Sequence, residues 1–201
     1  MKKTLVLAGM LLASVCASAQ NYFGVTAGYN LSTLSGADGL MDISPKSGFN
    51  AGIAYEHRFS GSDKGNLFLG ANVLYSLEGY HYKLSLPTGP IESSDMVLNN
   101  PIEYDEDVDI KYLKIPVSFG YNFKLSDNFG LAPKVFGILE SQLGVEHDDS
   151  DSVLDFAFGA GLNLNIGERW SVGLGYDWNP EPGDLKWCNA HANVTYYIFS
   201  K

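Results

Sequence analysis

From residue 20 onward, apolar and polar residues alternate with a period of two in eight segments, each roughly ten residues long. In the clearest segment, residues 154–166, seven apolar residues alternate with Asp, Ala, Gly and Asn. Alternation of this kind is typical of β-strands with two different faces. We therefore predict strands over residues 22–31, 48–59, 66–77, 110–123, 129–140, 154–166, 170–179 and 191–198. Pro133 lacks a backbone donor and predicts a bulge or bend within its strand.

The links between these segments alternate in length. Links around 60–65, 125–128 and 167–169 are short, whereas the others are longer, and one of them runs from about Leu84 to Asp109. Short turns at one end and long loops at the other are typical of a bacterial outer-membrane barrel, with the short turns on the periplasmic side. Tyr80, His81 and Tyr82 extend the third segment beyond the expected membrane edge, which predicts a ribbon that projects from the barrel.

The more polar face of each segment decides between a membrane barrel and a soluble one. It carries Gly, Ser, Asn, Lys and Glu, which would make a poor core for a soluble barrel because buried polar groups need partners. A closed barrel in lipid turns this face inward and pairs every strand edge. Aromatic residues also gather near the segment ends, as two interfacial girdles would require. The predicted fold is an all-β, eight-stranded, antiparallel up-and-down transmembrane β-barrel, and a lipocalin-like or periplasmic barrel is the alternative.

Residues 1–19 have the pattern of a cleaved signal peptide. Lys2 and Lys3 precede a short apolar run, and Ala17-Ser18-Ala19 supplies the small residues that the peptidase requires. The mature chain, residues 20–201, would then form a single barrel domain. A lipoprotein acylated at Cys16 is the alternative, but Val15 before it is bulkier than such sites prefer.

Composition agrees with an exported β-protein. The chain has 22 glycines together with 3 Trp, 12 Tyr and 11 Phe, and beyond the signal peptide it has no long apolar run. It holds 13 basic and 23 acidic residues, and removal of Lys2 and Lys3 brings the formal charge to −12. Such a charge argues against nucleic acid as a partner. Cys188 would be the one cysteine left, which excludes an intramolecular disulfide and leaves the role of this thiol open.

Several charged side chains fall on the inward register of the predicted strands. The interior of an eight-stranded barrel is just wide enough for side chains to fill it. Opposite charges there should pair, because an isolated buried charge is costly. We therefore predict a structural charge network in the lumen, with a gated channel or a proton path as the alternative. The predicted members are Glu56, Arg58, Glu78, Lys114, Lys134, Asp177 and His191.

Acidic residues also cluster in two of the expected loops. One cluster holds Asp105, Glu106, Asp107 and Asp109, and another lies within residues 146–151. Carboxylates of this kind suit Ca²⁺ or Mg²⁺, but neither stretch has the spacing of an EF-hand loop, and charge runs are usually solvated. We expect no cofactor and no dedicated metal site, with weak association at Asp105–Asp109 as the alternative.

Catalysis finds little support in the sequence. A serine hydrolase needs a nucleophile, a neighbouring base and an orienting carboxylate. The four histidines are His57, His81, His147 and His191, of which only His81 is expected near the outer end of a strand, and no G-x-S-x-G motif accompanies it. We expect a protein that is not an enzyme, with a lipid-modifying activity as the alternative.

The fourth segment carries a family resemblance. Its run Tyr112-Leu113-Lys114-Ile115-Pro116-Val117, continuing to Gly120-Tyr121-Asn122-Phe123, resembles the PorT-like outer-membrane β-barrel family. The runs that begin at Phe23 and at Phe158 are also similar to that family. The resemblance implies an eight-stranded barrel, and some members are tied to protein secretion. The chain departs from usual assembly signals by ending two residues after Phe199.

Taken together, these features predict a small, monomeric integral protein of the outer membrane of a Gram-negative bacterium, in contact with the outer-membrane lipid. Its role would be structural, or it would bind an envelope protein or an extracellular ligand through residues 84–109 and 140–152. A narrow channel or a secretion-associated barrel is the main alternative.

Overall fold

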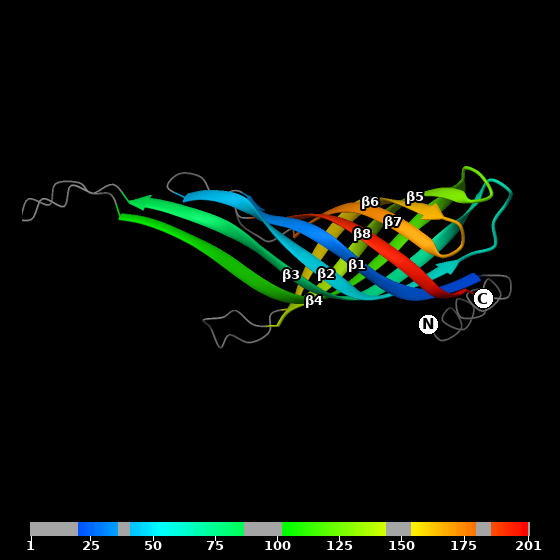
Figure 1. Ribbon diagram of the computed structural model, residues 1–201, viewed down its shortest axis with the longest axis horizontal. Helices are drawn as coiled ribbons and strands as arrows, with labels where there is room; N and C mark the ends of the chain where they lie inside the picture. The colour runs from blue at the N-terminus through cyan, green and yellow to red at the C-terminus, as the bar shows by residue number, and fades with distance from the viewer. Residues whose placement is uncertain (1–19, 36–40, 87–101, 144–153, 180–185, 201) are drawn as a thin grey trace, which may run out of the picture.

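The computed structural model describes residues 20–35, 41–86, 102–143, 154–179 and 186–200. The predicted signal peptide and the acidic stretch 146–151 lie outside these ranges. Eight antiparallel strands close into a barrel, in which each strand pairs with the next and β8 pairs with β1 (Figure 1). The described ranges contain no helix long and apolar enough to cross a membrane. The strands are β1 (Gln20–Ser35), β2 (Met41–Arg58), β3 (Gly65–Leu86), β4 (Ile102–Lys124), β5 (Phe129–Gln142), β6 (Leu154–Ile166), β7 (Trp170–Trp178) and β8 (Lys186–Ser200).

All eight predicted strands are present, but several are longer than predicted. The prediction of a long link from Leu84 to Asp109 is wrong at both ends, because β3 continues to Leu86 and β4 already begins at Ile102. β8 likewise begins at Lys186 rather than at residue 191. In each case the backbone ladder with a neighbouring strand continues past the expected end, which a period of two along a single segment does not reveal.

Proline interrupts one ladder without changing its register. The β4–β5 pairing omits Ala132 and Pro133, yet Gly120↔Lys134 and Phe123↔Leu131 follow the same register on either side. The predicted bulge at Pro133 is therefore wrong, and the missing N–H leaves only a gap. Register shifts occur instead between Phe23 and Gly24 on β1 and between Pro45 and Asn50 on β2.

The two faces of the barrel have opposite polarity. Outward side chains such as Phe119 are large, apolar and half exposed, whereas inward side chains such as Glu78 and Lys114 are almost fully buried. Asparagine, serine and threonine fill much of the remaining interior. A soluble protein would not leave so much apolar surface in water, so the predicted arrangement of polar inside and apolar outside is confirmed.

The short turns lie at one end of the barrel, and the strands that extend beyond the barrel do so at the other end. Short turns join β2 to β3, β4 to β5 and β6 to β7, at the end where β1 begins and β8 finishes (Figure 1, right). Gly167 in the last of these turns has a φ of 60°, which glycine adopts without strain. At the other end, β3 and β4 extend well beyond the barrel as the predicted ribbon (Figure 1, left).

Candidate functional site

Three carboxylates from three different strands converge on one lysine in the lumen. The Lys114 Nζ on β4 lies 2.6 Å from Glu78 Oε1, 3.1 Å from Glu140 Oε2 and 3.9 Å from Asp177 Oδ2. These acids come from β3, β5 and β7, and all four side chains are at most 4% exposed. The ammonium thus offsets part of a negative charge that the interior could not hold unpaired.

Hydrogen bonds hold the carboxylates of this cluster in place. Trp187 Nε1 donates to Glu78 Oε2 over 3.0 Å, and Asn189 donates to Asp177 Oδ1 over 3.3 Å. The Nδ1 atom of His191 lies 3.1 Å from the same Asp177 oxygen. Around the Trp187 ring pack the rings of Tyr80 and Tyr112, with centroid distances of 6.0 and 6.2 Å. The Lys114 cluster is therefore closed on the ribbon side by aromatic side chains.

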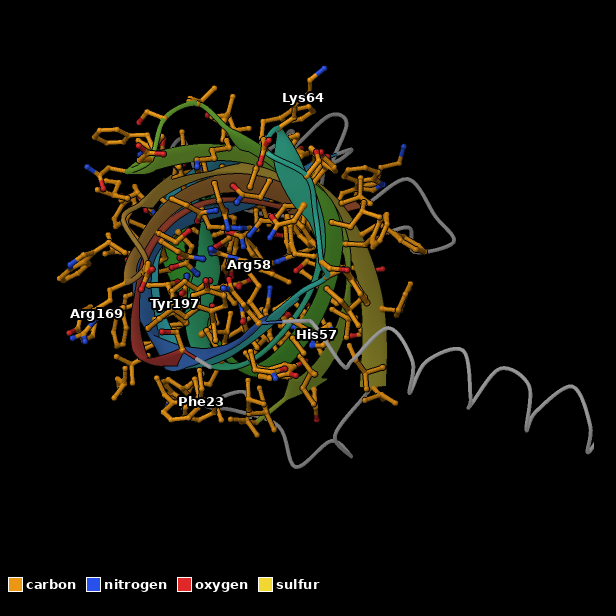
Figure 2. All side chains as sticks on the ribbon, turned by 90° about the vertical axis from the view of Figure 1, so that its right-hand side faces the viewer. Phe23, His57, Arg58, Lys64, Arg169 and Tyr197 are labelled. Atoms are coloured by element: carbon orange, nitrogen blue, oxygen red, sulfur yellow. The ribbon has the colours of Figure 1, made fainter. Side chains whose placement is uncertain are left out.

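A second charge pair occupies the lumen near the short turns. Arg58 Nε donates to Glu56 Oε1 over 2.5 Å, and the hydroxyl of Tyr197 donates to Glu56 Oε2 over 3.1 Å. The guanidinium of Arg58 lies 4.0 Å from the centre of the Tyr22 ring. Figure 2 looks into this end of the barrel and places Arg58 in the middle of the opening with Tyr197 beside it. This pair lies in the lumen close to its mouth.

Lys134 lies between the two groups. Within the described ranges it forms no salt bridge, and its Nζ lies 5.7 Å from the centre of the Phe136 ring. Its side chain borders two interior cavities of about 40 and 30 Å³, each with space for only a few water molecules. A third cavity of about 480 Å³ opens at the turn end, with Arg58 among its lining residues. The voids beside Lys134 are thus far smaller than the cavity at the turn end.

The predicted lumen residues therefore fall into two clusters and one separate lysine. Glu78, Lys114, Asp177 and His191 lie together, Glu56 and Arg58 form the second group, and Lys134 stands apart. Glu140 is not among the predicted residues, although it continues the inward register of its strand. Trp187, Tyr112 and Tyr197 are also absent from the prediction, because their partners are side chains on other strands.

The projecting ribbon carries a ladder of ion pairs on its outward face. Lys46 Nζ lies 2.9 Å from Asp109 and 3.4 Å from Asp107, while Lys83 Nζ lies 3.1 Å from Asp105. His81 places Nε2 3.0 Å from Asp105 and Nδ1 2.9 Å from Asp107. The hydrogen bond with His81, together with the charge of Lys46, lowers the pKa of Asp107. Partial burial opposes protonation of Lys46, but the carboxylates of Asp109 and Asp107 outweigh it and raise its pKa.

The four residues of the candidate metal loop do not converge. Strand alternation places Glu106 on the opposite face from Asp105, Asp107 and Asp109, where it accepts a hydrogen bond from the Tyr82 hydroxyl over 3.0 Å. The three aspartates already hold basic side chains. No group of three or more metal-ligating side chains lies close enough to hold an ion in the part of the chain that the structure describes. The expected loop is a strand, and its acids take part in cross-strand pairs.

Ser44, His81 and Asp107 lie side by side on three neighbouring strands. This resembles the order of a catalytic triad, but both ring nitrogens of His81 lie against aspartates. Across the described residues, no hydrogen bond links Ser44 to His81. A serine hydroxyl needs a free ring nitrogen to accept its proton, so the arrangement is that of an ion-pair ladder.

Comparison with known proteins identifies the family of this barrel. The model of the outer membrane protein beta-barrel domain matches residues 4–197. The chain belongs to this family. It is accordingly a protein of the Gram-negative outer membrane, as predicted, and the finer PorT-like resemblance remains a prediction. No protein among the curated ones matches.

Solved structures of other outer-membrane barrels are also similar to this chain. Ail of Yersinia pestis, in complex with the heparin analogue sucrose octasulfate, is 15% identical, with 89% of this chain and 97% of that chain covered and a TM-score of 0.43. Neisserial surface protein A is 13% identical, with coverage of 88% and 97% and a TM-score of 0.46. The outer membrane enzyme PagL is 14% identical, with coverage of 85% and 99% and a TM-score of 0.48.

Membership of the outer-membrane barrel family assigns an environment to each surface. The apolar outward face contacts lipid, and the end with the short turns faces the periplasm. The ribbon of β2, β3 and β4 then stands on the extracellular side. Cys188 lies near the base of this side, with its Sγ 3.7 Å from the Ser35 hydroxyl oxygen.

Proposed function

We propose that this protein is a non-conducting, non-enzymatic outer-membrane barrel that binds a partner at the cell surface through its projecting ribbon. The ribbon consists of residues 41–46 of β2, 79–86 of β3 and 102–110 of β4. The observation that carries the proposal is a reversal of polarity along these strands. Within the barrel the outward face is apolar, whereas on the ribbon the outward face is charged and the inner face, apart from Glu106, is apolar and aromatic.

The reversal can be followed along β3. Val73 and Tyr75 face outward into the lipid, and three two-residue steps after Tyr75 the same face carries His81 and then Lys83. Because charged side chains are not stable against lipid, the outer edge of the hydrocarbon lies just below Gly79. The residues beyond it therefore stand in water or among the headgroups, and they need not be apolar on either face.

The inner face of the ribbon is nevertheless mostly apolar and aromatic, and its acidic residue, Glu106, accepts a hydrogen bond from the Tyr82 hydroxyl. Ile43 and Tyr82 are cross-strand partners, as are Tyr80 and Val108, and Tyr104 is 49% exposed. A group of tyrosines and aliphatic side chains kept outside the membrane is typical of a recognition surface, since tyrosine contributes contact area at low entropic cost. A surface kept only for solubility would be polar on both faces.

The packed lumen supports a role as an anchor rather than a channel. The Lys114 cluster and the Glu56–Arg58 pair occupy the lumen at two levels, and the interior cavities of about 40 and 30 Å³ cannot pass a hydrated ion. A role in secretion, which the PorT-like resemblance implies, would make the partner an envelope protein. A lipid-modifying activity is less well supported, because both ring nitrogens of His81 are occupied.

A photo-crosslinking experiment in intact cells tests the proposal. A benzophenone side chain is introduced at Tyr104 on the inner face of the ribbon or at Phe119 on the lipid face, two positions that are 49% and 50% exposed. We expect a discrete protein or glycan adduct from position 104 alone. Replacing Tyr80 and Tyr82 by serine should abolish that adduct and leave heat-modifiable mobility on gels unchanged. Identical adducts from both positions, or none from position 104, would refute the proposal.

A further inference from the structure

We infer that the edge of β4 between Glu103 and Asp109, with which no described residue pairs, binds an extended peptide segment in which basic and apolar residues alternate. The inference rests on the proposed function, because the edge belongs to the same ribbon. It adds the class of partner and the way in which the partner binds. A strand added to an open sheet edge gains main-chain hydrogen bonds, and its alternate side chains provide specificity.

The edge begins where β5 ends at the barrel rim. The β4–β5 register begins at Tyr112↔Gln142, and the Leu143 amide donates to the Lys111 carbonyl over 2.8 Å. On its other side β4 stays paired with β3 as far as Ile102↔Leu86. Within the described ranges, residues 102–110 thus have one paired edge and one unpaired edge. In Figure 1 this part of β4 forms the lower border of the ribbon.

The peptide groups on this edge can be assigned from alternation. Along a strand, successive residues direct their N–H and C=O groups to opposite sides. The carbonyl of Lys111 points toward β5, so Glu103, Asp105, Asp107 and Asp109 direct theirs the same way. Tyr104, Glu106 and Val108, which lie between them, direct their N–H and C=O groups toward β3. The edge therefore offers four donors and four acceptors in a regular row, which is what a fourth strand requires.

The side chains along the edge specify what such a strand must carry. Glu103, Asp105, Asp107 and Asp109 share the outward face, on which Lys46 and Lys83 supply the lysine charges. The face therefore keeps an excess of negative charge. Directly opposed residues on neighbouring strands lie close enough for opposite charges to attract. Basic residues of the partner would stand opposite the acids. Its apolar residues would lie beside Tyr104 and Val108, on either side of Glu106, whose carboxylate accepts a hydrogen bond from the Tyr82 hydroxyl.

The same charges exclude a second copy of this chain as the occupant. Two β4 edges meeting each other would bring acid against acid across the new ladder, and like charges placed directly opposite are destabilising. Charged edges are a common protection against such self-pairing. A partner of opposite charge meets no such barrier, so the charge row selects for a basic strand.

Hydrogen exchange of the full-length protein in lipid nanodiscs tests the inference. The probe is a nine-residue peptide that alternates lysine and valine. In the free protein, the amides of Glu103, Asp105, Asp107 and Asp109 should exchange fast while the residues between them exchange slowly. The peptide should slow those four amides by about tenfold or more, since each gains a main-chain hydrogen bond. Two control peptides, one with all lysines contiguous and one with methylated backbone nitrogens, should give little protection.

Two substitutions at one position separate edge pairing from charge attraction. Asp107→Pro removes the edge N–H without touching the ladder to β3, and it should weaken the affinity for the peptide by about tenfold. Asp107→Asn keeps the N–H and should weaken it by only about two- to fivefold. Equal effects of the two variants, equal binding of the methylated peptide, or no change in exchange would overturn the inference.

The two proposals can fail separately. If the peptide does not slow exchange of the β4 edge amides but position 104 still forms its adduct, strand addition is refuted and the inner face of the ribbon remains the binding surface. Protection of the edge without any adduct at position 104 would refute the proposed function and leave a peptide site on β4.

Discussion

Replacement of Lys114 by methionine tests whether water screens the buried charges in the lumen. Methionine keeps the length of the side chain but removes the ammonium that lies within 4 Å of Glu78, Glu140 and Asp177. Those carboxylates are at most 2% exposed and would then repel one another in a closed interior. The perturbation thus removes one charge and leaves three others without their shared partner.

The size of the effect follows from the burial of the cluster. Removal of one partner from a buried ion pair costs about 3–5 kcal/mol, because the remaining charge is desolvated and uncompensated. A surface pair contributes only about 0.2–1 kcal/mol. Lys83, whose partner is Asp105, provides the matched control, since their side chains are 56% and 55% exposed. We therefore expect Lys114→Met to lower the free energy of unfolding several times more than Lys83→Met does.

Reversible urea unfolding in lipid vesicles, followed by tryptophan fluorescence and by gel mobility, measures both losses. Adding Glu78→Gln to Lys114→Met should recover part of the stability, because it removes one of the unpaired charges. A loss below about 1 kcal/mol for Lys114→Met, equal to that of the surface control, would show that water screens the cluster. The description of a packed, non-conducting lumen would then be refuted.

Three further predictions follow from the lumen, the ribbon and the strand packing. In planar bilayers the purified protein should give no conductance steps, and regular openings would contradict the closed lumen. Because its pKa is lowered, chiefly by the hydrogen bond with His81, Asp107 should stay ionised down to a pH below its ordinary value near 3.8. The contribution of ionised Asp107 to the stability of the ribbon is present above this ordinary value and is lost as the pH falls through the lowered pKa. An NMR titration should show this loss in the unsubstituted protein and not in Asp107→Asn. Gly120→Ala would place a Cβ 2.6 Å from the buried Phe68 ring and should cost about 1–3 kcal/mol in urea unfolding, whereas Gly167→Ala meets open space and should cost about 1–2 kcal/mol from its positive φ.

Much of the architecture was predictable because the alternation of apolar and polar residues that indicates a β-strand is contained within one segment of the chain. Alternation places each side chain on one of two faces, so the inward positions of Glu56 and Lys114 and the outward position of Phe119 could be read from one segment at a time. The alternating link lengths then indicated a membrane barrel and the end that carries its short turns. The same reasoning predicted that β3 would extend past the membrane edge at Tyr80.

The composition of the clusters could not be predicted in this way. Glu140 stands directly opposite Lys114 in the β4–β5 ladder, and Glu78 lies on β3, the other neighbour of β4. Asp177 reaches Lys114 only because closure of the ring brings β7 across the lumen from β4. Their depth depends on the register of every ladder between them, and one shifted pair would separate them. Trp187 escaped prediction for a related reason, since the beginning of β8 is set by its pairing with β1 and β7.

The sequence by itself therefore determined the strands, their faces and the membrane setting. The tertiary structure decided which charges pair and which strand edge stays open. Among the described residues, the β5 side of β4 has partners only from Lys111 onward, because β5 ends at Gln142; this is a fact about its neighbour rather than about β4 itself. Period-two alternation is encoded within each segment, whereas contacts across the lumen and the ends of ladders depend on two or more segments at once.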